Sequence, residues 1–205
     1  MGLFNAANNY GKKNEFEKME LCLNELRELH ERHPEKEVRE KLAMGLDNAT
    51  FCYGEKNEFK KMEERLNELR ELHNKHQEKE IRELFAAGLV NAVACYGKSS
   101  KLRDMEACLK ELRELHKKYP EKEVRKWLAM GLFNAAKGYG EKNEFEKIEK
   151  CLKELRELHK KYPEKEVRES LVMSLVTAMN HYGEKEKFRK MEARLNELRE
   201  LHKKY

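Results

Sequence analysis

The chain has 205 residues, of which 40% are charged, and its 44 lysines and arginines stand against 39 aspartates and glutamates for a net charge of +5. Disordered chains combine low hydrophobicity with a large unbalanced charge, so the near-balance of signs favours a folded protein with a solvated surface. No stretch of 18 apolar residues occurs, which excludes a membrane-spanning helix. Five cysteines without framework spacing and an N-terminus without a signal-peptide pattern predict a cytoplasmic protein.

The sequence repeats itself with a period of 43 residues. The pair Tyr-Gly returns at Tyr10, Tyr53, Tyr96, Tyr139 and Tyr182, and the string Leu-Arg-Glu-Leu-His ends at His30, His73, His116, His159 and His202. Four full repeats (1–43, 44–86, 87–129 and 130–172) and a shorter fifth (173–205) fill the chain without a linker. The sequence is therefore predicted to form one repeat array rather than several domains.

The first helix of each repeat, here called the A helix, is predicted from apolar residues that step by three or four. In the second repeat these are Val38, Leu42, Leu46, Ala49 and Tyr53, which share one face of a helix. The Tyr-Gly pair follows this face at its C-terminal end. Because glycine readily adopts the left-handed conformation, we expect it to cap the A helix.

The second helix, here called the B helix, is predicted to begin at an N-capping residue and to end before a proline. Asparagine and serine are favourable N-caps, and they recur as Asn14, Asn57, Ser100 and Asn143. The B helix ends near Pro34, Pro120 or Pro163, with Gln77 in place of a proline once. These patterns predict an all-α protein, an αα-hairpin repeat solenoid of five A/B pairs.

One segment resembles a known repeat family. The residues from 134 to 147, NAAKGYGEKNEFEK, are similar to the end of the first helix, the turn and the start of the second helix of a tetratricopeptide repeat, although the period is 43 rather than 34 residues. Ala135, Tyr139, Asn143, Phe145 and Pro163 occupy positions comparable to the family's small, aromatic, turn and closing residues. The resemblance implies a superhelix whose A helices line a concave groove for a protein or peptide partner.

Motifs for enzymatic or metal chemistry are weak. Gly97-Lys98-Ser99 matches the end of a phosphate-binding loop, but the glycine required five residues earlier is replaced by Ala92. His30 and His33 are three residues apart, and two ligands do not make a structural metal site. No histidine or carboxylate is phased against a cysteine as a catalytic pair requires. We therefore expect no enzymatic activity, no cofactor and no metal.

The repeats differ from each other mainly at a few A-helix positions, which makes these the candidates for a binding surface. The first position carries Phe4, Asp47, Val90, Phe133 and Val176, and the second, four residues later, carries Asn8, Phe51, Ala94, Lys137 and Asn180. A third includes Trp127, and Asn5, Asn48, Asn91 and Asn134 are predicted to lie at the groove edge. Large apolar residues away from the core direction suggest a contact surface, with packing between repeats as the alternative. The asparagines either bind a peptide backbone or bridge neighbouring helices.

Three functional hypotheses follow. The favoured one is a non-enzymatic scaffold that binds a peptide or helix of a protein partner in the A-helix groove. The second is an RNA-binding repeat protein that uses lysines at the B-helix ends, namely Lys117, Lys118, Lys160, Lys161, Lys203 and Lys204. Acidic residues on the candidate groove, such as Glu40, Asp47 and Glu83, make nucleic acid the less favoured partner. The third is a structural or engineered array without a ligand.

The two ends of the array predict self-association. Repeat 1 starts at Met1, in register with Met44, so its A helix lacks the N-terminal half. In the fifth repeat, apolar residues such as Phe188, Leu195 and Leu198 have no following helix to cover them. Because the interior stacks the same helix types on each other, these two surfaces are expected to be complementary and to allow head-to-tail association as a fibre or a ring. The alternative is that the chain is part of a longer array.

Overall fold

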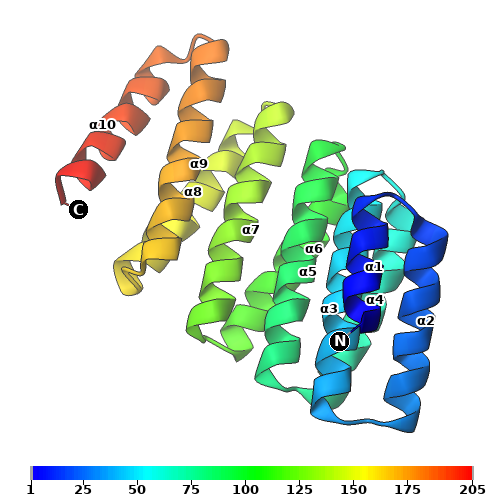
Figure 1. Cartoon of the computed structure of the whole chain (residues 1–205). Helices are drawn as coiled ribbons and strands as arrows, with labels where there is room; N and C mark the ends of the chain where they lie inside the picture. The colour runs from blue at the N-terminus through cyan, green and yellow to red at the C-terminus, as the bar shows by residue number, and fades with distance from the viewer. Residues whose placement is uncertain (1, 205) are drawn as a thin grey trace. The chain divides into compact units, whose positions relative to one another are not determined.

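The computed structural model describes residues 2–204, and within that range the chain is helical throughout, with ten helices and no strand (Figure 1). The helices are α1 (Gly2–Lys12), α2 (Phe16–Arg32), α3 (Lys36–Glu55), α4 (Phe59–His76), α5 (Lys79–Lys98), α6 (Leu102–Lys118), α7 (Lys122–Glu141), α8 (Phe145–Lys161), α9 (Lys165–Glu184) and α10 (Phe188–Lys204). They form five αα-hairpins in sequence, which confirms the predicted fold class. A search of residues 2–204 for a helix both long and apolar enough to cross a bilayer finds none.

The A helices are α1, α3, α5, α7 and α9, and all have 20 residues except α1, which has 11. The hairpins begin in the loops before these helices, so the predicted boundaries at 43/44, 86/87, 129/130 and 172/173 fall inside α3, α5, α7 and α9. Met1 and Tyr205, at the ends of the first and fifth repeats, lie outside the described residues. The packing divides the chain into two compact units, Met1–Cys95 and Tyr96–Tyr205, which are described separately.

The core of each unit consists of leucines and other apolar residues on the inner faces of the hairpins. In the first unit α3 packs on α1, α2 and α4, and Leu23, Leu46 and Leu69 are at most 1% exposed. In the second unit α7 packs on α6, α8 and α9, and Leu132 and Leu155 are equally inaccessible. Full burial of each such side chain contributes about 1.5–3 kcal/mol, so the phased leucines stabilise the hairpins.

The turn between the A and B helices differs from both capping predictions, the glycine cap of the A helix and the asparagine or serine N-cap of the B helix. Gly54 lies inside α3, and no glycine among residues 2–204 has a positive φ. The left-handed residue is instead Asn57, with a φ of 60°. Its N–H donates to Gly54 O (3.0 Å), and the N–H of Glu58 donates to Tyr53 O (3.0 Å), which is the Schellman arrangement.

The same turn recurs in every hairpin, with a left-handed residue at Asn14, Asn57, Ser100, Asn143 and Glu186. The residues predicted as N-caps of the B helices therefore terminate the A helices instead. Glu58, which precedes α4, makes no side-chain capping hydrogen bond. Asparagine suits this position because its short polar side chain tolerates the left-handed region better than most residues do.

Glycine follows the recurring tyrosine of each A helix, and at Gly11, Gly54, Gly97 and Gly140 the next A helix approaches closely. A Cβ atom on Gly11 would lie 2.8 Å from Cys52 Sγ, and one on Gly54 would collide with Cys95 Sγ. In the second unit a Cβ on Gly138 would lie 2.8 Å from Gly97 Cα. Each of these glycines thus packs against the residue that precedes the tyrosine of the next A helix. This contact sets the spacing of the A helices.

Polar contacts repeat along with the apolar ones. Arg27 binds Glu68 in a bidentate pair between α2 and α4 (2.8 and 3.0 Å), and Arg113–Glu154 and Arg156–Glu197 repeat it between the later B helices. The hydroxyl of Tyr53 donates to Glu20 (2.8 Å), and those of Tyr139 and Tyr182 donate to Glu106 and Glu149. Burial, together with these carboxylates, raises the pKa of the three tyrosines. Exposed pairs contribute little stability each, but their regular geometry fixes the register between hairpins.

Candidate functional site

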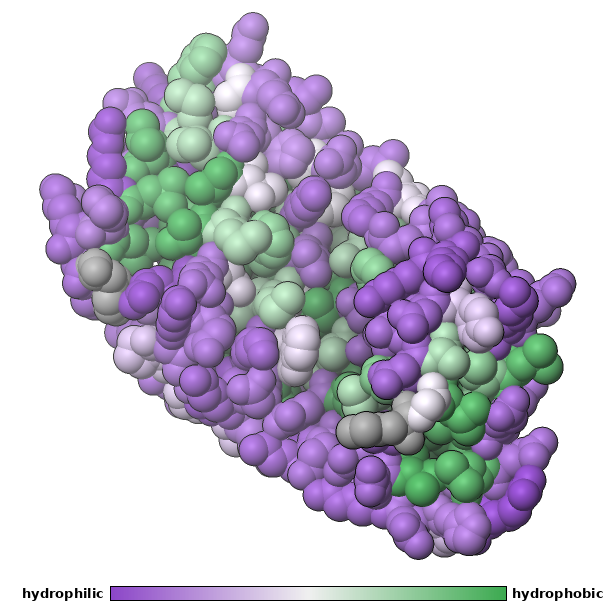
Figure 2. Space-filling view, in the orientation of Figure 1, coloured by the Kyte–Doolittle hydropathy of each residue, from purple (hydrophilic) through white to green (hydrophobic). Residues whose placement is uncertain are grey.

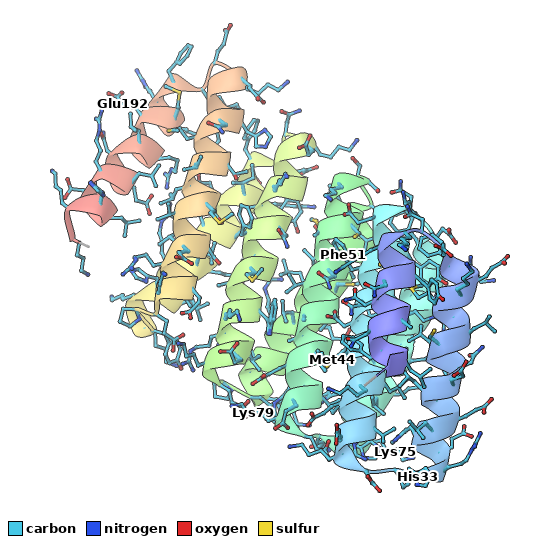
Figure 3. All side chains as sticks on the ribbon, in the orientation of Figure 1. His33, Met44, Phe51, Lys75, Lys79 and Glu192 are labelled. Atoms are coloured by element: carbon cyan, nitrogen blue, oxygen red, sulfur yellow. The ribbon has the colours of Figure 1, made fainter. Side chains whose placement is uncertain are left out.

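The candidate residues lie on one side of each A helix; we call this side the A-helix surface and describe it for each unit. In the first unit it comprises Phe4, Asn5 and Asn8 of α1, Lys41, Met44, Asp47, Asn48 and Phe51 of α3, and Val90, Asn91 and Ala94 of α5. Within each helix these residues recur every three or four positions and so share one side. Figure 3 labels Met44 and Phe51 on this side of α3.

Phe51 is the most accessible large apolar residue of this surface in the first unit. Its side chain is 46% exposed, whereas Leu46 and Tyr53 of the same helix are 1% exposed. Phe4, Asn8 and Asn48 are half-buried, and Asn5 is exposed. An apolar ring exposed to solvent on a well-packed helix is typical of a contact surface.

Two α5 positions behave differently from their counterparts. Val90 is only 3% exposed, so it belongs to the core, and the alternative of packing between repeats applies there. Asn91 Nδ2 donates a hydrogen bond to Asp47 Oδ1 (3.0 Å), so this asparagine bridges α5 and α3. Burial raises the pKa of the Asp47 carboxyl to about 7, against the smaller opposing effect of the Asn91 hydrogen bond. Asp47 is thus engaged in a helix–helix contact.

In the second unit the A-helix surface comprises Trp127, Met130, Phe133, Asn134 and Lys137 of α7 and Met173, Val176 and Asn180 of α9. These two helices pack against each other. Met173 and Val176 are 49% and 38% exposed, and Lys137 and Asn180 are also exposed. Trp127, Phe133 and Asn134 are half-buried. Figure 2 shows apolar patches separated by polar side chains on the face that carries α7 and α9.

A cavity of about 330 Å³ adjoins Phe4 in the first unit. Its apolar lining is Leu3, Phe4, Leu26, Leu29 and Val38, and Glu37 and Lys41 add charged groups. The described part of α1 begins at Gly2, the counterpart of Gly45, which is the tenth residue of α3. Leu29 is accordingly 37% exposed, whereas its counterparts Leu72, Leu115 and Leu158 are 7–9% exposed. Comparing the repeats identifies the missing half-helix, but only the structure reveals the cavity.

The lysines considered for nucleic-acid binding lie at the C-terminal ends of three B helices. Lys117 and Lys118 end α6, Lys160 and Lys161 end α8, and Lys203 and Lys204 end α10; all six are exposed. Lys203 pairs with Glu200 (2.8 Å). Positive charges at helix C-termini are favourable for the helix dipole, which gives these lysines a structural role of their own.

The cysteines lie mainly in the interior of the hairpins, and the histidines recur near the ends of the B helices. No group of three or more histidine, cysteine, aspartate or glutamate residues there is arranged to hold a metal ion. All five cysteines are free thiols, and all but the half-buried Cys52 are buried. Burial raises the pKa of Cys22 and Cys52, and that of Cys151 to about 12, which disfavours the reactive thiolate.

Comparison with known proteins gives no relative: no family model matches the chain, and no curated protein sequence is significantly similar to it.

Proposed function

We propose that this protein is a non-enzymatic interaction scaffold that binds a peptide or helix from a protein partner on its A-helix surface. The observation that carries this proposal is the exposure of Phe51, Met173 and Val176 on helices that bury most of their other large apolar residues. Exposed apolar side chains surrounded by polar ones are typical of protein-binding surfaces. The resemblance to tetratricopeptide repeats, in which the A helices line the binding groove, supports the same surface.

The composition of the surface suits an amphipathic partner. In the first unit Phe51 offers a contact for an apolar anchor residue and Asn8 offers hydrogen-bonding groups. In the second unit Val176 offers the apolar contact, and Asn180 and Lys137 offer the polar groups. Aromatic and aliphatic anchors of this kind supply most of the energy of a typical protein interface. We place the interaction in the cytoplasm, because five free thiols suit a reducing compartment.

The test compares two surface variants with a matched control. Phe51→Lys and Val176→Lys place a charge on the A-helix surface, and Leu21→Lys does the same at a 61% exposed leucine of α2, outside that surface. In affinity capture from nuclease-treated lysate, the first two variants should lose a protein that wild type and Leu21→Lys retain. The binding constant of that protein, once purified, should show the same order.

Two results would contradict the proposal. One is equal capture of every partner by all four proteins, which would show that the A-helix surface is not used. The other is capture that disappears on nuclease treatment and weakens steeply with salt, which would indicate nucleic-acid binding through the lysines instead.

A further inference from the structure

The two outermost hairpins each leave uncovered a face that the interior hairpins bury. α10 packs on α9 but has no buried residue, whereas α8 packs on both α7 and α9 and buries six. Phe188 of α10 is 59% exposed, while its counterpart Phe145 is half-buried. At the other face, a Cβ atom added to Gly2 of α1 would meet nothing within 4 Å.

The interior shows what belongs on each of these faces. A Cβ on Gly45, at the counterpart position of Gly2 in α3, would lie 2.8 Å from Leu23 and 3.6 Å from Leu26 of the preceding B helix. Gly88 sits in the same way against Leu66 and Leu69. Gly2 therefore leaves room for two leucines of a neighbouring B helix. The counterparts of those leucines on α10 are Leu195 and Leu198, both half-buried.

The aromatic and polar contacts between hairpins extend this correspondence. Tyr182 stacks on Phe145 with ring centroids 5.2 Å apart, and its hydroxyl donates to Glu149 (2.5 Å). One period later the same positions are Phe188 and Glu192 on α10, both exposed. In the interior a tyrosine of the next A helix contacts these two positions, and Tyr10 of α1 is the tyrosine in the same register. Figure 3 labels Glu192 on α10.

The arginine–glutamate ladder also ends in a complementary pair. Arg156 binds Glu197 through two hydrogen bonds of 2.6 and 2.9 Å. The next arginine in register is Arg199 on α10, and the first glutamate in register is Glu25 on α2; both are exposed. The α10 face thus carries the last arginine of this series, and the α1–α2 face carries its first glutamate.

We propose that copies of this chain associate head to tail, with the α1–α2 face of one copy seated on the α9–α10 face of another. In this register Gly2 covers Leu195 and Leu198, Tyr10 meets Phe188 and Glu192, and Glu25 pairs with Arg199. Each contact repeats one that the fold already makes between hairpins. The apolar, aromatic and charged groups therefore contact the same residue types as they do in the interior. The contact joins two different faces, so each bound copy leaves one of each for another copy, in a fibre or a larger closed ring.

Sedimentation velocity over a wide concentration range tests the proposal with a matched pair of variants. Gly2→Arg adds a long side chain at the centre of the contact, where the isolated chain has open space. Ala107→Arg adds the same side chain to an exposed position of α6 outside both faces. Wild type and Ala107→Arg should associate beyond two copies, and Gly2→Arg should need about tenfold or more higher concentration to do so. Circular dichroism should show the same helicity for all three.

A charge exchange tests the register. Glu25→Arg and Arg199→Glu each place like charges at the junction and should weaken self-association. An equal mixture of the two restores opposite charges at every mixed junction and should associate more strongly than either alone. A wild type that remains at 24.5 kDa throughout, a saturating dimer, or variants that associate like wild type would overturn the proposal.

Discussion

The side-chain amide of Asn91 donates a hydrogen bond to the carboxylate of Asp47 across 3.0 Å, joining α5 to α3 inside the first unit. This contact places an ionisable group where water reaches it poorly, and burial raises the Asp47 pKa to about 7 from an ordinary value of 3.8. At pH values between these two pKa values, the Asp47 carboxyl is protonated in the folded state and ionised in the unfolded state. Asp47 therefore lowers stability progressively as the pH rises from about 4 to 7.

Asp47→Asn should stabilise the protein at neutral and alkaline pH. The amide keeps an oxygen to accept the Asn91 hydrogen bond but carries no charge to bury. We expect a gain of about 1–2 kcal/mol in the free energy of unfolding at pH 8, reduced from the full pKa effect because the residue is partly solvated. Urea unfolding at pH 4 and pH 8 measures it. A gain of the same size at pH 4 would contradict the explanation by charge burial.

The histidines at the B-helix ends should make the protein less stable in mild acid. Burial lowers the pKa of His30, His116 and His159 below 6.5, with Arg125 and Lys161 adding repulsion at His116. Below 6.5 the unfolded chain binds protons that the folded chain does not, so stability falls as the pH drops from about 7 to 5. His116→Gln should recover about 0.5 kcal/mol of that loss. An equal gain from His116→Gln at pH 8, where the imidazole is neutral in both states, would contradict this cause.

Glu186→Gly should stabilise the last hairpin. Glu186 has a φ of 54°, a conformation that costs a non-glycine residue about 1 kcal/mol, and it occupies the position of Asn57 in the Schellman turn. Thermal unfolding should show a higher midpoint for this variant. Glu184→Gly places glycine at the last residue of α9, where φ is not positive, and should not raise the midpoint. If both changes act in the same direction, the turn geometry is not the cause.

Gly54→Ala should destabilise the first unit because its methyl group would collide with Cys95 Sγ. Overpacking of this kind costs about 1–3 kcal/mol. Cys95→Gly in the same chain removes the opposing side chain and should recover part of the loss, since the second unit packs Gly97 against Gly138 at this position. A double-mutant cycle by chemical denaturation measures the coupling between the two sites. Additive effects would show that the two residues do not oppose each other.

The turns between the A and B helices and the exposure of the A-helix surface were the features that the sequence predicted least well. Asparagine is favourable both as an N-cap and in the left-handed position that ends a helix, and only one residue separates these two roles at Asn57. The outcome depends on where the carbonyl of Tyr53 finds its donor, which is a property of the packed hairpin. Phe51 is an exposed candidate as expected, whereas Val90 fits the same pattern and is buried. A pattern within one helix cannot show how closely a neighbouring helix covers it.

The sequence alone determined that this protein is a five-hairpin helical repeat array, because apolar spacing of three and four residues specifies helices and a 43-residue period specifies their repetition. The tertiary structure decided the rest: that glycine marks the approach of one A helix to the next, that Asn91 binds Asp47, and that Val90 is buried. These features depend on contacts between residues about 40 positions apart, and local propensity contains no information about such contacts.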